Sequence, residues 1–182
     1  MIQADQVGHL VMEPGQAAYE AVVKAFEPDA AGKETANAEG TILRPDGTID
    51  RGVLGSIVFA DKGKLEILNS IVHPAVKDWI RREVVRQQEM GCSLLIIEAA
   101  LLIEDHYSEI CQELWYIHTD AQVRRVRLKA SRGYTDERID SIFRNQLSEE
   151  AFRQACQVVI DNSGSLEETK KQIRYVITQK EN

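Results

Sequence analysis

Three short, uninterrupted runs of apolar residues constrain the fold of this chain most strongly. They lie at residues 94–97, 114–117 and 158–160. Continuous runs of this length are typical of parallel strands that are covered on both faces, whereas half-exposed strands alternate apolar and polar residues. Helical patterns separate the runs, so the sequence predicts an α/β fold with a parallel sheet. Residues 2–5 predict the end of a further strand.

The helical patterns have recognisable ends. Pro74 fits the first position of a helix whose apolar stripe contains Val76 and Ile80. Two segments, residues 119–122 and 165–168, match the capping-box pattern S/T-x-x-E/Q. Each predicts the first turn of a helix that follows a strand.

Two long segments interrupt the alternation of strands and helices. Residues 27–50 are polar and rich in glycine and turn residues, which indicates a surface loop. Residues 16–90 as a whole contain helical patterns without an apolar run of the strand type, so we expect a helical insertion on the sheet. All 182 residues are expected to form one domain.

Charge and cysteine content exclude several classes of protein. No run approaches the roughly 20 apolar residues of a membrane helix, and no secretory signal is recognisable. The net charge of −7 disfavours general nucleic-acid binding. Three widely spaced cysteines without a CxxC motif predict neither a disulfide framework nor a zinc site. We expect a cytoplasmic protein with no nucleic-acid or membrane partner.

Two acidic residues follow expected strands. Asp5 at the carboxyl end of a parallel strand would point into the crevice where α/β proteins bind ligands, and could accept or orient the proton of a substrate hydroxyl. The alternative is that Asp5 caps the next helix. Glu98 likewise ends a strand and could hold Mg²⁺ through water, or could simply cap.

His73, which precedes Pro74, is expected at a helix N-terminus. The free amides and the dipole of such an end favour anions. A capping role without any ligand is equally compatible with the sequence.

The segment 121–133 is unusual because it holds five cations and no acid in an acidic chain. A solvated helix face is the ordinary interpretation of such a run. The functional interpretation is an arginine-bearing flap over phosphates, because guanidinium groups match phosphate oxygens. Gly133 and a new helix start at Thr135 predict a helix–turn–helix, which is a typical construction for a lid.

A turn at residues 161–165 follows the last predicted strand. Its sequence, Asp161-Asn162-Ser163-Gly164-Ser165, is explained by turn chemistry alone. A loop at this edge of a sheet is also where a purine ring commonly rests.

Six ordered segments resemble the dephospho-CoA kinase family, and the resemblance spans residues 3 to 177. The segments are Ala4-Asp5 with His9, Glu13-Pro14-Gly15, Asp46-Gly47-Thr48-Ile49-Asp50-Arg51 with Val58-Phe59, Ile71-Val72-His73-Pro74, Glu98-Ala99-Ala100-Leu101-Leu102-Ile103-Glu104, and Val159-Ile160-Asp161-Asn162-Ser163-Gly164-Ser165. The resemblance implies a P-loop-kinase-like three-layer α/β fold with a parallel sheet, a helical substrate-binding insertion at 16–90 and a lid at 121–153. It also implies that ATP, with Mg²⁺ and no tightly bound cofactor, phosphorylates the ribose 3′-hydroxyl of dephospho-CoA.

The resemblance assigns a role to each candidate residue. Asp5 would be the base or the hydroxyl-orienting carboxylate. Arg51 and His73 would bind dephospho-CoA. The lid would contribute Arg132 and Arg138, and Asn162 would lie near adenine. No protein ligand for a metal is assigned.

The sequence departs from the family pattern at its start. The family has a first, central strand and a G-x-x-x-x-G-K-[ST] loop before the segment at Ala4-Asp5, and neither occurs in residues 1–182; Gly32-Lys33-Glu34 does not match this motif. That loop neutralises the transferred phosphates. We therefore expect the fold to lack its first strand and the 182 residues to have little or no kinase activity. A non-catalytic protein that binds CoA or dephospho-CoA is the alternative.

Overall fold

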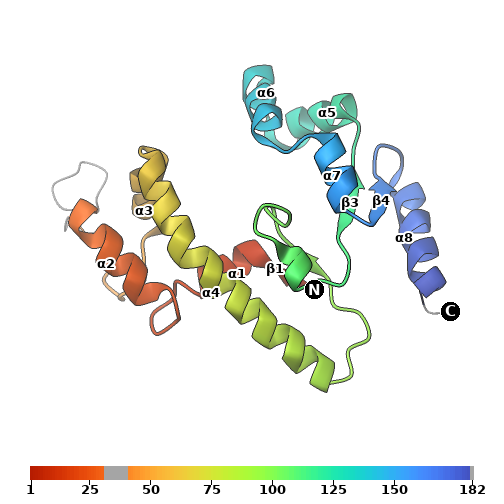
Figure 1. Ribbon diagram of the computed structural model, residues 1–182. Coiled ribbons are helices and arrows are strands. Elements are labelled where there is room, and N and C mark those ends of the chain that lie inside the picture. Colours follow the sequence, from red (N-terminus) through yellow and green to blue (C-terminus); the bar gives the residue numbers. More distant parts are fainter. Residues whose placement is uncertain (31–40, 181–182) are drawn as a thin grey trace. The chain divides into compact units, whose positions relative to one another are not determined.

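The computed structural model describes residues 1–30 and 41–180 (Figure 1). The chain divides into two compact units, residues 1–105 and residues 106–182. None of the helices within the described residues has the length and apolar content that crossing a bilayer requires.

The first unit consists of helices and one pair of short strands. Its elements are β1 (Ile2–Gln3), α1 (Ala4–Leu10), α2 (Tyr19–Ala30), α3 (Arg51–Phe59), α4 (Lys62–Glu89) and β2 (Ile97–Glu98).

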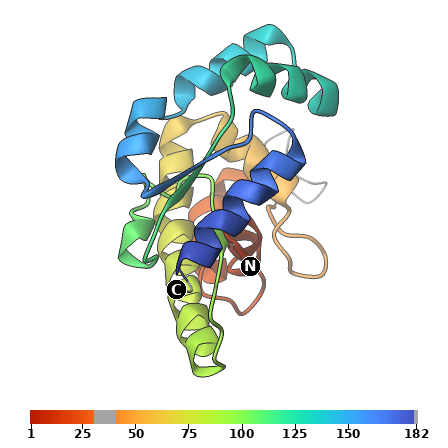
Figure 2. The same ribbon diagram turned by 90° about the vertical axis from the view of Figure 1, so that its right-hand side faces the viewer.

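The second unit contains the other strand pair and four α-helices. Its elements are the 3₁₀ turn η1 (Tyr107–Glu109), β3 (Trp115–His118), α5 (Ala121–Arg132), α6 (Asp136–Asn145), α7 (Glu149–Ala155), β4 (Val158–Asp161) and α8 (Leu166–Lys180). Helix α8 packs along β4, as Figure 2 shows.

Both strand pairs are parallel, as the apolar runs predicted. In the first unit β1 pairs with β2, with Gln3 opposite Glu98. In the second unit β3 pairs with β4 over four residues, from Trp115 opposite Val158 to His118 opposite Asp161. Within the described residues these are two separate two-stranded sheets. Helices follow β1, β3 and β4 at their carboxyl ends, whereas a turn follows β2.

The run at residues 94–97 forms less strand than its composition predicted. Regular pairing begins only at Ile97, and the side chains of Leu94 and Ile96 are 55% and 51% exposed. A strand requires a backbone partner, and the partner of β2 among the described residues is the two-residue strand β1. The buried strand expected at 94–96 is therefore wrong.

Helix α4 forms the centre of the first unit and contacts α1, α2 and α3. Val76 and Ile80 on α4 are buried, as the apolar stripe predicted. They share the core with Val7 of α1, Leu54 of α3 and Val22 of α2. The helices that follow β1 and precede β2 are therefore held together by one apolar core.

The predicted start of a helix at Pro74 is wrong, because α4 begins twelve residues earlier at Lys62 and continues through the proline. Asp61 caps the true start, where its Oδ1 accepts from the amides of Gly63 at 2.8 Å and Lys64 at 3.4 Å. Proline lacks the N–H that would bond one turn back. Burial of Val76 and Ile80 beyond it stabilises the continuous helix.

The predicted surface loop at 27–50 is wrong at its start, because helix α2 extends through Ala30. Residues 41–50 form turn and loop structure, as the sequence predicted, and an antiparallel bridge between Leu43 and Ile49 closes the turn. Gly47, at φ 81°, adopts the left-handed conformation that this turn requires, and its carbonyl accepts from the Tyr19 hydroxyl. The segment Gly32-Lys33-Glu34 lies outside the described residues.

The helix ends of the second unit confirm most of the predicted signals. Gly133 closes α5 at φ 63°, and Thr135 starts α6 by accepting from the amide of Arg138. The capping box at 165–168 is confirmed: the Ser165 amide donates to Glu168 Oε2 at 2.8 Å, and the Glu168 amide donates to Ser165 Oγ at 3.3 Å. The box predicted at 119–122 is wrong, because Asp120 caps α5 instead.

Candidate functional site

The carboxyl ends of β1 and β2 bring polar side chains together. Gln3 and Glu98 are opposite each other in the register, and Gln3 Nε2 donates to Glu98 Oε2 at 3.1 Å. This edge of a parallel pair is where α/β proteins bind ligands. Helix α1 starts directly after Gln3, so its first turn belongs to the same edge.

Asp5 lies in that first turn and is exposed. The N-cap residue of α1 is Gln3, whose side chain makes no capping bond, so the interpretation of Asp5 as a helix cap is wrong. No side chain among the described residues donates a hydrogen bond to its carboxylate. A carboxylate in this position can accept a proton or a hydroxyl hydrogen bond from a ligand.

Glu98 provides a second exposed carboxylate at the same edge. It does not cap a helix, because a turn follows β2. Within residues 1–30 and 41–180, no three His, Cys, Asp or Glu side chains are grouped closely enough to enclose a metal ion. The donor set nevertheless suits Mg²⁺, which proteins commonly hold by one or two carboxylates with water and substrate phosphates as the other ligands.

His73 lies in the middle of α4 and not at a helix N-terminus, so free helix amides do not explain it. Its Nδ1 is 3.0 Å from Asp105 Oδ1, and Lys77, one turn later, donates to the Asp105 carbonyl at 2.7 Å. Asp105 therefore orients the imidazole. Sequence reasoning missed Asp105; the only local signal is the acidic pair that it forms with Glu104.

Arg51 is the first residue of α3 and is exposed. Asp50, its neighbour, caps the helix by accepting from the amides of Gly52 at 2.9 Å and Val53 at 3.2 Å. These two bonds, with the amide of Val53 contributing most, lower the pKa of the Asp50 carboxyl. The guanidinium of Arg51 has no hydrogen-bonded partner within the described residues and can pair with a phosphate.

The structure brings these three candidates onto one helical cluster. Asp5 is on α1, Arg51 on α3 and His73 on α4, and α4 contacts both other helices (Figure 1). The sequence separations of these residues gave no indication of that arrangement.

In the second unit, α5 and α6 form a hairpin that uses three of the five clustered cations internally. Arg124 lies 4.0 Å from the ring centroid of Phe143 on α6. Arg125 pairs with Asp136 at 2.8 Å and with Asp140, and Lys129 pairs with Asp136 at 2.6 Å. These contacts lower the pKa of Asp136, with the Lys129 hydrogen bond as the larger cause and the Arg125 bond as the second. Arg125 and Lys129 therefore stabilise the hairpin and are not available to a ligand.

Arg132 and Arg138 lie on either side of the turn at Gly133. Arg132 is exposed in the last turn of α5 and has no partner within the described part of the chain. Arg138 stacks its guanidinium over the ring of Tyr134, 4.0 Å from the centroid. Of these two, Arg132 is the residue that the hairpin leaves fully available for an anion.

The turn after β4 orients Asn162 from both sides. Its amide donates to the His118 carbonyl at 2.7 Å, and its Oδ1 accepts from the Thr169 hydroxyl at 3.1 Å. The side-chain Nδ2 is thereby left as the outward donor. Asp161 forms the predicted turn by accepting from the Ser163 amide at 2.8 Å.

Electrostatics keep the carboxylate at the start of this turn ionised. The pKa of Asp161 is lowered, first by hydrogen bonds from Ser163 and then by His118. His118 Nδ1 is 3.6 Å from Asp161, and its Nε2 is 3.5 Å from Glu149 of α7. The imidazole thus lies between carboxylates from two elements.

Comparison with known proteins gives consistent matches over most of the chain. The sequence model of the dephospho-CoA kinase family matches residues 1–168. The dephospho-CoA kinases of Symbiobacterium thermophilum and Carboxydothermus hydrogenoformans are each 33% identical to this chain. The first match covers 95% of this chain and 67% of the relative; the second covers 97% and 80%. The solved structure of a dephospho-CoA kinase from Campylobacter jejuni matches 98% of this chain and 83% of that chain, with a TM-score of 0.71 and 22% identity, which supports the P-loop-kinase-like α/β fold.

Proposed function

This chain belongs to the dephospho-CoA kinase family of phosphotransferases, for which ATP and dephospho-CoA are the substrates, and from that premise we propose a role for each candidate residue. The proposal divides the work between the two units. The first unit binds the acceptor and activates its hydroxyl. The second binds the adenine and the phosphates of ATP, and Glu98 of the first unit is the candidate for the accompanying Mg²⁺.

Asp5 accepts or orients the proton of the ribose 3′-hydroxyl of dephospho-CoA. The observation that carries this assignment is its exposed carboxylate, which has no partner within the described residues and lies in the first turn of α1, the helix that follows β1. In phosphoryl transfer the acceptor hydroxyl must be positioned and must lose its proton as the new bond forms. A carboxylate that the fold has not already used for a cap is suited to both tasks.

Arg51 and His73 bind the acceptor from the helical region at residues 16–90. Dephospho-CoA carries a pyrophosphate, and an exposed guanidinium is a good partner for phosphate oxygens. His73 is held at Nδ1 by Asp105, so its Nε2 is the atom that would meet the ligand. We expect an oriented imidazole to contribute more to specificity than a mobile one.

The hairpin within residues 121–153 acts as the lid, with Arg132 and Arg138 directed to the phosphates of ATP and Asn162 to adenine. Mg²⁺ would accompany ATP, and Glu98 would hold it through water, which is consistent with the preference of this ion for carboxylate and water ligands. Mg²⁺ neutralises phosphate charge when bound. Location in the cytoplasm and the absence of nucleic-acid and membrane partners remain predictions from sequence.

Two measurements on the 182-residue chain test the proposal. Isothermal titration calorimetry with dephospho-CoA measures acceptor binding, and adenosine of equal concentration serves as the control ligand. A coupled assay for ADP release, with ATP and Mg²⁺ present, then distinguishes phosphoryl transfer from binding alone. Absence of dephospho-CoA binding would contradict both the kinase function and the alternative of a non-catalytic protein that binds dephospho-CoA.

A further inference from the structure

Arg127 on α5 contacts the turn after β4 through both ends of its guanidinium. Its Nη1 donates to the carbonyl of Asn162 at 2.6 Å, and its Nη2 donates to the carbonyl of Gly164 at 3.1 Å. The cluster of cations at residues 121–133 and the turn sequence at residues 161–165 did not predict this contact. A planar guanidinium is suited to it, because two parallel N–H groups can bond two acceptors at once.

The rest of this turn is held from other elements. The Asn162 amide bonds to the His118 carbonyl of β3, and the Ser163 hydroxyl accepts from the Asp120 amide at 2.8 Å. Thr169 of α8 holds the Asn162 side chain. Arg127 provides the hydrogen bonds to the carbonyls of Asn162 and Gly164, and these bonds join the turn to α5.

We propose that Arg127 is a positioning residue for adenine-nucleotide binding, an inference that rests on the proposed role of Asn162. By holding two carbonyls, Arg127 keeps the turn in one conformation before the base arrives, so that binding does not incur the entropy cost of ordering it. Arg127 also links the turn to the lid. Arg132 lies on the same helix, about 7.5 Å further along its axis at 1.5 Å per residue. The contact therefore sets the position of a lid arginine relative to the base.

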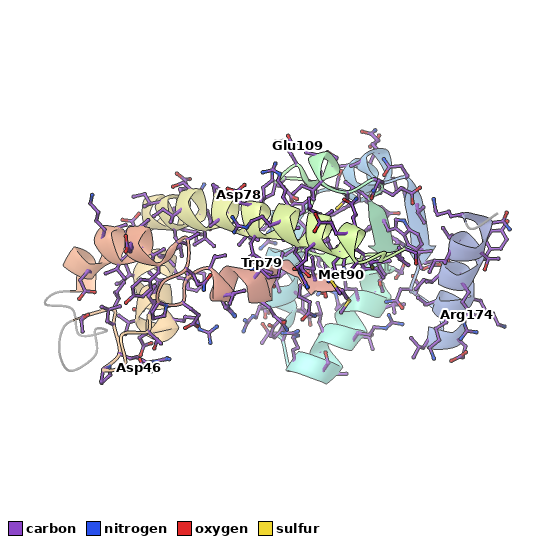
Figure 3. All side chains as sticks on the ribbon, turned by 90° about the horizontal axis from the view of Figure 1, so that it is seen from below. Asp46, Asp78, Trp79, Met90, Glu109 and Arg174 are labelled. Atoms are coloured by element: carbon purple, nitrogen blue, oxygen red, sulfur yellow. The ribbon has the colours of Figure 1, made fainter. Side chains whose placement is uncertain are left out.

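The proposal is tested with Arg127→Met, Arg127→Lys and a control, Arg174→Met. Arg174 is an exposed residue of α8, labelled in Figure 3, and its replacement makes the same change in charge in the same unit. Methionine retains a high helix propensity and an unbranched side chain, but it cannot donate a hydrogen bond. Lysine retains the charge but offers a compact ammonium instead of a fork.

The first readout is amide hydrogen exchange without ligand. We expect Arg127→Met to accelerate amide exchange at residues 162–165 about tenfold and to leave exchange in α8 unchanged. Tenfold corresponds to the smallest free-energy loss expected when hydrogen bonds from a charged group are removed. Arg127→Lys should give an intermediate value, and Arg174→Met none. Unchanged exchange in Arg127→Met would overturn the positioning role.

The second readout is calorimetric titration with ATP and Mg²⁺, and separately with dephospho-CoA. We expect Arg127→Met to weaken ATP binding about tenfold and to leave dephospho-CoA binding at the wild-type value. Faster exchange with unaltered ATP affinity would overturn the link to nucleotide binding. If the wild-type chain binds no ATP, the proposed nucleotide site fails and the inference fails with it, whereas the exchange data still report whether Arg127 holds the turn.

Discussion

The hydroxyl of Thr169 donates to Oδ1 of Asn162 at 3.1 Å, and Thr169 is the buried polar residue of α8, at 7% exposure. The same hydroxyl lies 3.3 Å from the Ser165 carbonyl and 3.5 Å from the Asp161 carbonyl, so Asn162 is its shortest contact. This bond decides which end of the Asn162 amide faces outward. A side chain on α8 therefore controls the hydrogen-bonding character of the turn after β4.

Replacing Thr169 with valine removes the donor and preserves the shape of the side chain. We expect Thr169→Val to weaken ATP binding several-fold, because the Asn162 amide is then free to rotate, and to lower stability by about 1 kcal/mol for the lost hydrogen bond. Calorimetry and urea unfolding measure the two effects. Thr169→Ser, which retains the hydroxyl, should restore ATP affinity; failure to do so would show that packing and not the hydroxyl is responsible.

Asp5→Asn removes the charge of the proposed catalytic carboxylate with little change in size. We expect the rate of phosphoryl transfer that the 182-residue chain retains to fall at least about 100-fold, since general-base assistance contributes this much, and dephospho-CoA binding to change little. The control is Glu20→Gln, which neutralises an exposed acid in the first turn of α2. If the two variants changed the rate of phosphoryl transfer equally, the proposed catalytic role of Asp5 would be contradicted.

Two arginines of α5, Arg132 and Arg125, predict opposite results. Arg132→Met should weaken ATP binding without altering the melting temperature, because Arg132 has no internal partner among the described residues. Arg125→Met should lower the melting temperature, because it breaks contacts with Asp136 and Asp140. Thermal unfolding followed by circular dichroism, together with ATP titration, separates them. A stability loss only in Arg132→Met would reverse these assignments.

Glu83 on α4 predicts a pH dependence of stability. Hydrogen bonds from Arg86 and then Gln87 lower the pKa of this carboxyl from 4.5 to about 2. Because the folded pKa is lowered, the contribution of Glu83 to stability is complete above pH 4.5 and is lost as the pH falls toward 2. Glu83→Gln should therefore melt below wild type at pH 7, and the difference should shrink as the pH falls through about 2. A pH-independent gap between the two would exclude this ionic contribution.

The two capping-box matches give a matched pair of substitutions. Ser165→Ala should reduce the free energy of unfolding by about 1 kcal/mol, because it removes a real N-cap. Thr119→Ala, at the false match, should have almost no effect on helix capping, because Asp120 caps α5. Urea unfolding of both variants measures the difference, and equal losses would mean that Thr119 stabilises α5 in some other way.

The sequence by itself determined the local structure of this protein and its family. The turn at Gly133 and the capping box at Ser165 follow from interactions among residues that are near in sequence. The continuous apolar runs located β3 and β4, although the pairing of these two strands joins residues far apart in the chain. The six ordered segments identified the dephospho-CoA kinases for the same reason: motifs remain contiguous whatever the chain does elsewhere.

Only the tertiary structure decided which side chains are used internally and which remain for a ligand. Asp105 on His73, Asp140 on Arg125 and Arg127 on Gly164 are each brought together across 15 to 37 residues. The sequence pattern did not locate the start of α4 either. Asp61 caps a helix that begins twelve residues before the predicted start at Pro74, and packing in the core stabilises the helix through the proline. Such outcomes depend on which partner lies within about 3 Å after folding, and distance along the chain contains no information about that.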